Sequence, residues 1–430
     1  MPPGGPAVGR QREYDPRVRM RWKLVLAAGA LVAVAVVAYF LWTRSLSRDF
    51  DAHVARYHAE GRPMSRAALA RPPVAPAENA AGPLTEMWSL VTALDGRVEE
   101  ITSLHDLEPE PLTDAQRDEL RRGLAELTPV LAKVHEAVAR PRLVLPFDPK
   151  ASPGLSLRTE PLKIARDLLL AEHRAGLATA ARTIRSLLDL TARWDVQTRQ
   201  EPYARRNVRE AAFHMLADEL AAGRPIEDAE LLAWSERLRL AVSAEWTALG
   251  VAFDDERVQI IDVVERARRG EPLDAPDRTS GGTPCRRVAA YEGWFGRDRL
   301  YADAIEALDR VDARWLESKD EGSLGVVLKR RRGHHPMYPI FEDYNDYSGI
   351  REHLAALKLA RIAVHIRHVM EAGGARPASL DDLRGVLDAD ALHDPLTGEP
   401  FSMDRTAEGA TIVRRPTDSR SARFDAWSIR

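Results

Sequence analysis

The chain has 430 residues, of which 45% are hydrophobic and 30% charged; 62 lysines and arginines against 65 aspartates and glutamates leave a formal net charge of −3 at pH 7. This balance argues against a nucleic-acid-binding surface, which needs clustered excess basic residues. The single cysteine, Cys285, excludes an intramolecular disulfide and a cysteine-based zinc site. The length allows two or three domains or one extended helical array.

The first predicted element is a transmembrane helix over Leu24–Trp42. These nineteen residues contain no charge, and they extend about 28 Å as a helix, enough to cross the hydrocarbon core of a bilayer. A cleaved signal peptide would have a shorter apolar core ending in a small-x-small site, and the aromatic end of this run offers none. A buried core helix seldom lacks charge over such a length. We therefore expect an uncleaved signal anchor at 24–42, with the lipid bilayer as its partner.

Flanking charge predicts the orientation of this anchor. Residues 1–23 carry two acidic residues against six basic ones, Arg10, Arg12, Arg17, Arg19, Arg21 and Lys23. Positive charge resists translocation, so the basic arm 1–23 should stay in the cytoplasm while the rest crosses the membrane. Subtracting these six and two residues from the totals of 62 and 65 leaves 56 basic and 63 acidic residues, a formal charge of −7, for the remainder.

Residues 43–83 are predicted to form a proline-rich stalk that holds the following domain off the bilayer. Prolines stiffen an extended connector, and five lie in the second half of this segment: Pro63, Pro72, Pro73, Pro76 and Pro83.

Residues 84–345 are predicted to form a helical ectodomain, because apolar residues recur there every three or four positions. One helix is expected to carry the stripe from Leu84 to Ile101, and a second the stripe from Leu120 to Val138, started by a capping box between Thr113 and Gln116. Further stripes cover 162–169, 177–191, 208–220, 231–242, 258–264 and 300–315, with loops at 271–295 and 320–348. Five tryptophans fit these stripes as core residues: Trp88, Trp194, Trp234, Trp246 and Trp315.

The tail, residues 346–430, changes character. A long helix with apolar residues from Leu354 to Met370 should stop at Gly373, and Ser379 should cap a short helix with Asp382 three residues on. Residues 401–404 and 410–413 read as a β-hairpin, to which 424–429 could add a strand. The predicted fold class is mostly α: a transmembrane helix, an α-hairpin bundle or irregular solenoid, and a small C-terminal β-hairpin after a long helix.

The tail resembles the C-terminal module of type II secretion pseudopilins over residues 350–430. The resemblance lies in the long helix, the segment 375–383, the segment 394–401 and the hairpin. The N-terminal signature of that family is missing, because Leu24–Trp42 contains no glutamate and no Gly-Phe-Thr peptidase site precedes it. The whole layout is similar to a group of uncharacterised bacterial membrane-anchored helical proteins, which share the anchor, the segments 140–146 and 161–166, and this ending. That resemblance implies a bacterial inner-membrane protein with a periplasmic domain and implies no activity.

Candidate chemistry is sparse. His365 and His368 share a helix face and could bind a metal given a third ligand, although surface histidines are the commoner explanation, and the loop residues Asp394, Glu399 and Asp404 could hold calcium if they converge. A tight turn stiffened by proline is the alternative for that loop. Glu317 could act as the acid of a cell-wall hydrolase if burial raised its pKa. The basic run Lys329–Arg332 could contact an anionic lipid or polymer, but a solvated loop explains it equally well.

No phosphate-binding glycine loop, metalloprotease HExxH motif or serine nucleophile motif occurs in the sequence. The sequence therefore predicts no catalytic, cofactor-binding or metal-binding residues. The leading hypothesis is a non-enzymatic scaffold or docking module in the bacterial envelope, with a protein partner there. An accessory of a secretion or pilus-like machine and a cell-wall hydrolase are the two alternatives.

Overall fold

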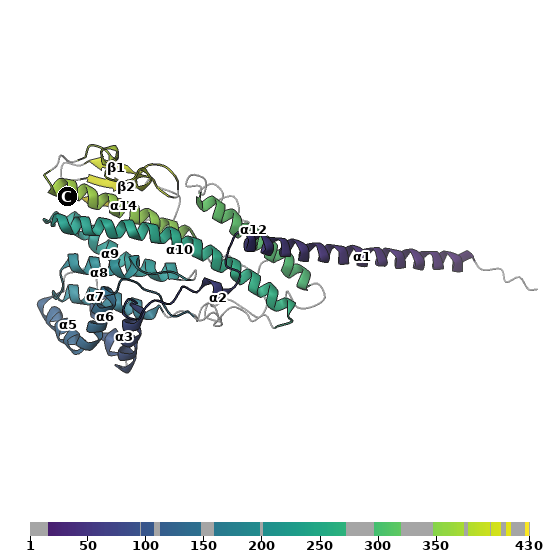
Figure 1. The fold of residues 1–430 in the computed structure, drawn as a ribbon, viewed down its shortest axis with the longest axis horizontal. Coiled ribbons are helices and arrows are strands. Elements are labelled where there is room, and N and C mark those ends of the chain that lie inside the picture. The colour runs from purple at the N-terminus through teal and green to yellow at the C-terminus, as the bar shows by residue number, and fades with distance from the viewer. Residues whose placement is uncertain are drawn as a thin grey trace, which may run out of the picture.

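The structure, a computed structural model, is predominantly helical and carries a small antiparallel sheet near the C-terminus (Figure 1). It describes residues 16–94, 96–106, 112–147, 159–197, 201–271, 296–319, 347–373, 377–395, 397–405, 410–413 and 426–429. The predicted mostly-α class is confirmed.

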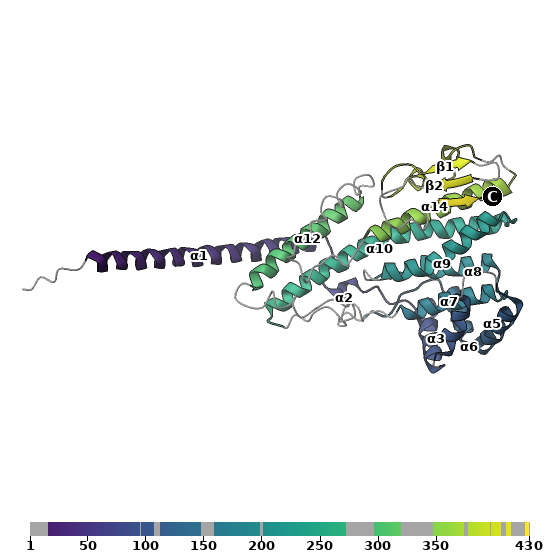
Figure 2. The ribbon, with the colours of Figure 1, turned by 180° about the vertical axis from the view of Figure 1, so that it is seen from behind.

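Helix α1 (Pro16–Ala59) projects from the body and contains the whole predicted anchor (Figures 1 and 2). The helix is long and apolar enough to cross a membrane, and its most apolar part is not buried in the protein. The helix does not end at the predicted boundary, because residues 43–59 continue it. The prediction of an extended stalk is therefore wrong for residues 43–59, which belong to the same helix as the apolar run.

The second half of α1 packs into a three-helix base with α10 (Asp228–Arg268) and α12 (Gly296–Lys319). Phe50 and Tyr57 of α1 are fully buried there. They lie in an apolar cluster with Leu249, Phe253, Ile260, Ile261, Leu300, Leu308 and Val311. Tyr57 also donates a hydrogen bond to Asp312 of α12, 2.8 Å away. Burial of each large apolar side chain contributes about 1.5–3 kcal/mol, so the base fixes α1 to the body.

The proline-rich segment that follows is also not a free stalk. It contains the single-turn helix α2 (Arg66–Leu69) and then runs along the body. The backbone amide of Arg71 donates to the side-chain oxygen of Gln197 at 2.9 Å. Further on, the Asn79 side chain donates to the Val144 carbonyl and accepts from the Val144 amide, both at 3.0 Å. Side-chain amides thus satisfy backbone groups that prolines and extended chain leave unpaired.

Two predicted long helices are each broken in two. The first is divided into α3 (Ala81–Ala93) and α4 (Arg97–Asp106), with Gly96 between them at a positive φ of 83°. The second is divided into α5 (Asp114–Glu126) and α6 (Thr128–Ala139), where a proline occupies the start of α6. The capping box between Thr113 and Gln116 is confirmed. The apolar residues recur at helical spacing across both breaks, so periodicity alone did not reveal them.

The next helices are α7 (Glu160–Arg174), α8 (Ala180–Ala192) and α9 (Glu201–Ala222). Leu177 does not belong to the stripe of α8 as predicted; it lies in the connecting loop and is 52% exposed. Helix α9 ends at Ala222, directly before the predicted stop residue Gly223, which has a positive φ of 66°. The two helices predicted at 231–242 and 258–270 are one, because α10 runs unbroken for 41 residues.

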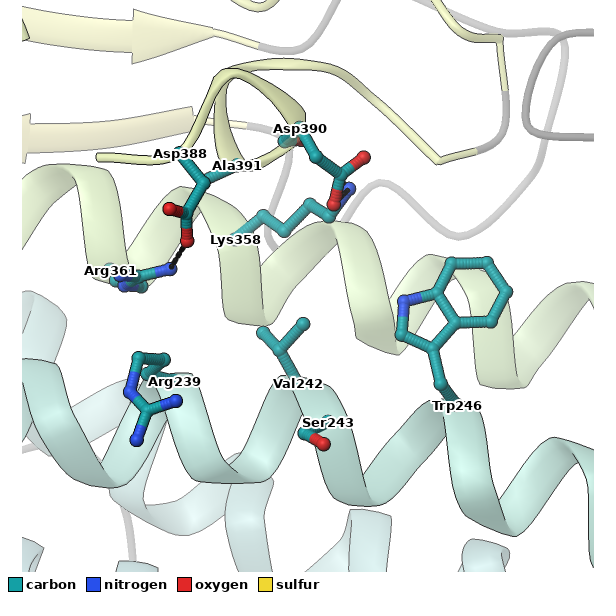
Figure 3. A pocket seen from close by; sticks show the side chains of 9 residues that line it. All are labelled: Arg239, Val242, Ser243, Trp246, Lys358, Arg361, Asp388, Asp390 and Ala391. Carbon is teal, nitrogen blue, oxygen red and sulfur yellow. Dashed lines mark hydrogen bonds and ion pairs between the residues drawn. The ribbon is translucent and has the colours of Figure 1, made fainter. Parts of the chain in front are cut away.

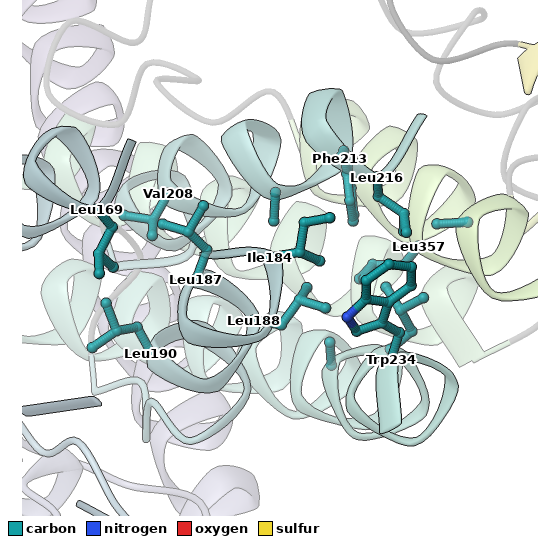
Figure 4. Close-up of a cluster of buried hydrophobic side chains, with 14 of the residues drawn as sticks. Leu169, Ile184, Leu187, Leu188, Leu190, Val208, Phe213, Leu216, Trp234 and Leu357 are labelled. Atoms are coloured by element: carbon teal, nitrogen blue, oxygen red, sulfur yellow. The ribbon is translucent and has the colours of Figure 1, made fainter. Parts of the chain in front are cut away.

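The main core lies where α8, α9, α10 and α14 (Tyr347–Glu371) meet (Figure 4). Leu188 of α8, Phe213 of α9, Trp234 of α10 and Leu357 of α14 are each at most 1% exposed. Helix α10 also contacts α12, so the one helix spans this core and the three-helix base.

After α14 come two 3-10 helices, η2 (Leu380–Leu383) and η3 (Ala389–Leu392), and the strands β1 (Ser402–Arg405), β2 (Ala410–Val413) and β3 (Ala426–Ile429). The strands form an antiparallel sheet in the order β1-β2-β3, with Met403 opposite Ile412 and Ile412 opposite Trp427. The predicted hairpin, third strand and Ser379 capping box are confirmed. Trp427 is buried and the sheet packs against α9 and α14.

Candidate functional site

The three histidines of α14 do not form a metal site. His365 is buried with its Nε2 3.0 Å from the Ser235 hydroxyl, and burial lowers the pKa of His365 to about 4. His368 instead faces Asp228 at 3.4 Å, and His353 lies against Arg209. Within the described ranges, no three His, Cys, Asp or Glu side chains lie close enough to hold a metal ion.

The predicted calcium loop is a tight turn. The Asp394 amide donates to the Glu399 carbonyl at 2.8 Å, and the Gly398 amide donates to the Asp394 carbonyl at 2.7 Å, with Gly398 at a φ of 70°. Asp394 is buried while Asp404 is exposed on β1. These residues do not form a metal-binding group in the part of the loop that the structure describes.

The structure describes some of the other residues singled out in the sequence and leaves others outside its described ranges. Glu317 belongs to α12. The positions Cys285 and Lys329–Arg332 lie outside the described residues.

A cavity of about 250 Å³ lies between α10, α14 and the segment around η3 (Figure 3). We call it the α10–α14 pocket. It is lined by Arg239, Val242, Ser243 and Trp246 of α10, Lys358 and Arg361 of α14, and Asp388, Asp390 and Ala391. The helix period explains the arrangement, because positions 239, 242, 243 and 246 share one face of α10 and positions 358 and 361 share one face of α14.

Lys358 is a structural cation of this pocket. Its side chain is 1% exposed, and its ammonium group lies 3.0 Å from the Asp390 carboxylate and donates to the Asp390 carbonyl at 2.9 Å. A buried charge is tolerated when it is paired and hydrogen-bonded. Lys358 therefore links α14 to η3, and the Asp390 carboxylate neutralises its charge.

Arg361 differs from Lys358 in being weakly paired. Its side chain is 10% exposed, and its nearest anion is Asp388, with 3.8 Å between Nη1 and Oδ2. The Nε–H group of Arg361 is buried without a hydrogen-bond partner. Burial lowers the pKa of this guanidinium; the charge of Asp388 opposes this effect, and that of Arg239 adds to it. The pocket thus contains a desolvated cation with unused donor capacity.

The α10 wall is mixed: Val242 and Trp246 are apolar, while Arg239 and Ser243 are polar. Trp246 and Val242 are half-buried on α10 (Figure 3). The sequence predicted Trp246 as a core residue like Trp234, which is fully buried; instead Trp246 is partly buried, lines the pocket and packs on the edge of the three-helix base. An anionic group could therefore meet Arg361 while an apolar neighbour meets Trp246.

A second group of charges is buried in the core and lines no pocket. Glu245 of α10 lies 2.5 Å from Arg209 and 3.0 Å from Arg205, both on α9, and all three side chains are at most 2% exposed. Burial opposes the charge of Glu245, but the two guanidinium groups outweigh it and hold its pKa at about 2. His353 accepts from Arg209 at 3.2 Å, and burial holds its pKa well below the ordinary value, so it is neutral.

Next to this cluster, Glu201 is fully buried at the start of α9. Its carboxyl group accepts from the Gln197 amide at 2.7 Å, while its other oxygen has no partner. Burial raises the pKa of Glu201 to about 8, and the nearby charge of Asp255 adds to the effect. These buried groups link α9 to its neighbouring helices and line no pocket. The α10–α14 pocket is therefore the candidate functional site.

Sequence reasoning missed this pocket. One signal was present: Lys358 and Arg361 interrupt an otherwise apolar stretch of α14, and a charge inside a buried helix needs a partner or a function. Comparison with protein-family models, with curated proteins and with solved structures finds no match.

Proposed function

We propose that this chain is a single-pass membrane-anchored docking module of the bacterial envelope, with its basic arm in the cytoplasm and its helical body on the far side. The observation that carries the proposal is the continuity of α1. One helix contains the apolar run Leu24–Trp42 and then Phe50 and Tyr57, which are buried in the three-helix base. A flexible tether would leave a body free to drift, whereas this helix fixes it relative to the anchor.

The proposal implies a base that lies close to the bilayer. Arg268, at the C-terminal end of α10, pairs with Asp51 of α1 at 2.7 Å. Asp51 follows Trp42 by nine residues, which is about 14 Å of helix. The end of α10 would therefore lie just outside the headgroup region, with the α10–α14 pocket further out on the body and open to a partner.

Topology tests this proposal directly. Alkaline phosphatase fused after Arg430 of the full chain should be active in intact bacteria, because the enzyme needs the oxidising side of the membrane. A matched fusion that lacks residues 24–42 should be inactive. An inactive fusion of the full chain would reverse the orientation and overturn the envelope assignment.

A second candidate is an accessory of a secretion or pilus-like machine that docks through its tail. The three-stranded sheet packed on α14 favours it, since a long helix carrying a small sheet is what the resemblance to pseudopilins implies. Crosslinking in membranes followed by purification should recover secretion components with the full chain, and a variant ending after Gly373 should lose them. Recovery from both, or from neither, would reject this role.

A further inference from the structure

We propose that the α10–α14 pocket binds an acidic side chain of a peptide segment in a protein partner, with an apolar residue of that segment against Trp246. The proposal deepens the docking function above and rests on it. It begins with the guanidinium of Arg361, whose buried Nε–H group has no partner and whose nearest carboxylate is 3.8 Å away.

The charges around the pocket select an anion over a cation or a neutral group. Lys358 is neutralised by Asp390, and Arg239 is engaged by Glu236 through two hydrogen bonds of 2.7 and 2.6 Å. Arg361 is left with Asp388, whose side chain is 80% exposed and makes no hydrogen bond to it. A planar guanidinium pairs best with a carboxylate, which can accept two parallel hydrogen bonds from it.

Size and apolar surface narrow the ligand further. A volume of about 250 Å³ is below that of pockets that hold drug-sized ligands, and it suits one or two amino-acid side chains. Trp246 and Val242 offer an apolar wall beside the cation. Docking sites draw most of their affinity from a few such anchors, where an aromatic or arginine side chain meets a group that excludes water.

Two capped dipeptides test the proposal without altering the protein. N-acetyl-Phe-Glu-amide should bind the full-length protein in detergent micelles with a dissociation constant on the order of millimolar, read by ligand-observed NMR. N-acetyl-Phe-Gln-amide, which keeps the shape and loses the charge, should bind at least tenfold more weakly. Equal binding of the two peptides, or no binding of the glutamate peptide, overturns the proposal.

Three variants test whether the preference for the glutamate peptide arises from the α10–α14 pocket. Arg361→Gln should abolish the preference for the glutamate peptide, while Arg384→Gln, which removes an exposed arginine paired with Asp381 outside the pocket, should keep it. Asp388→Asn should tighten binding of the glutamate peptide severalfold, because it removes the anion that competes for Arg361. Asp388 makes no side-chain hydrogen bond to the start of η3, so a merely structural role would not produce a gain.

Two further outcomes would also reject the proposal. A preference that survives Arg361→Gln rejects the pocket as its origin. Binding of N-acetylphenylalanine, which carries a free carboxylate, without binding of the glutamate peptide would make the occupant a small molecule and reject peptide docking. None of these variants changes α1, so the phosphatase fusion tests the anchoring function separately. An active fusion together with no preference for the glutamate peptide would reject the peptide-binding inference and leave the anchoring function standing.

Discussion

At the scale of single residues, Glu245 is a fully buried carboxylate held by two ion pairs. Its single carboxylate is shared by two buried arginines, Arg205 and Arg209, which also donate to backbone carbonyls. Helical periodicity could not have found this cluster, because arginine and glutamate in a stripe normally mark the solvated face. Only the packing of α9 against α10 and α14 encloses them.

Replacing Glu245 by glutamine should destabilise the protein by about 3–5 kcal/mol, the usual result of leaving buried charges unpaired. The measurement is the unfolding of the full chain in detergent, followed by circular dichroism at pH 7. Glu236→Gln is the matched control, because Glu236 is exposed on the same helix and pairs with exposed Arg239; it should change stability by less than about 1 kcal/mol. Similar effects of the two substitutions would contradict the buried charge cluster as a stabilising unit.

Glu201 should make stability depend on pH in a defined direction. Its pKa is raised from 4.5 to about 8 in the folded protein. The unfolded chain ionises near 4.5 while the folded chain holds the proton, so the contribution of Glu201 is most favourable below pH 4.5 and is lost as pH rises toward 8. Glutamine cannot ionise, so the unfolding free energy of Glu201→Gln minus that of the wild type should grow between pH 5 and pH 8 and then level off. An unchanged difference across that interval would refute the raised pKa, and Glu99→Gln, at an exposed position, controls for general pH effects.

At the scale of elements, local signals that act through the backbone were readable from the sequence. The capping box at Thr113, the stop at Gly223 and the Ser379 cap are confirmed because each depends on neighbours within four residues. The breaks at Gly96 and before Thr128 were missed, since a stripe of apolar residues continues across them. The continuity of α10 was missed for the opposite reason: its buried face turns from the main core to the three-helix base, so the apolar residues change side along the helix.

Substitutions at two helical glycines distinguish the effect of helix propensity on stability from the effect of side-chain packing. A Cβ at Gly123 of α5 would lie 2.9 Å from Cγ1 of buried Ile101, whereas a Cβ at Gly82 of α3 meets nothing within 4 Å. Gly123→Ala should therefore cost about 1–3 kcal/mol through overpacking of α4 on α5. Gly82→Ala should be neutral or stabilise by up to about 1 kcal/mol, because alanine favours helix. Thermal unfolding of both variants compares them, and a stabilising Gly123→Ala would show that α4 and α5 do not pack this closely.

At the scale of the whole molecule, the joint between anchor and body is the feature on which the docking proposal depends. Phe50→Ala should remove about 3–5 kcal/mol from the base, as for other large-to-small core changes, because Phe50 is fully buried and its ring meets Tyr301 at 5.9 Å between centroids. Leu240→Ala, at a position 44% exposed on α10, is the control and should cost far less. Unfolding of both variants in detergent measures the difference; equal costs would mean that α1 is not packed as described.

The sequence by itself determined the apolar run, the helical class and the small C-terminal sheet, because hydropathy, period and turn residues are properties of short stretches of chain. It could not determine that residues 43–59 extend the anchor helix, since that depends on Phe50 and Tyr57 finding partners on α10 and α12 about two hundred residues and more away. The α10–α14 pocket was likewise decided by tertiary structure. Arg361 and Trp246 become one site only when two helices and η3 are brought together, and no local pattern encodes that approach.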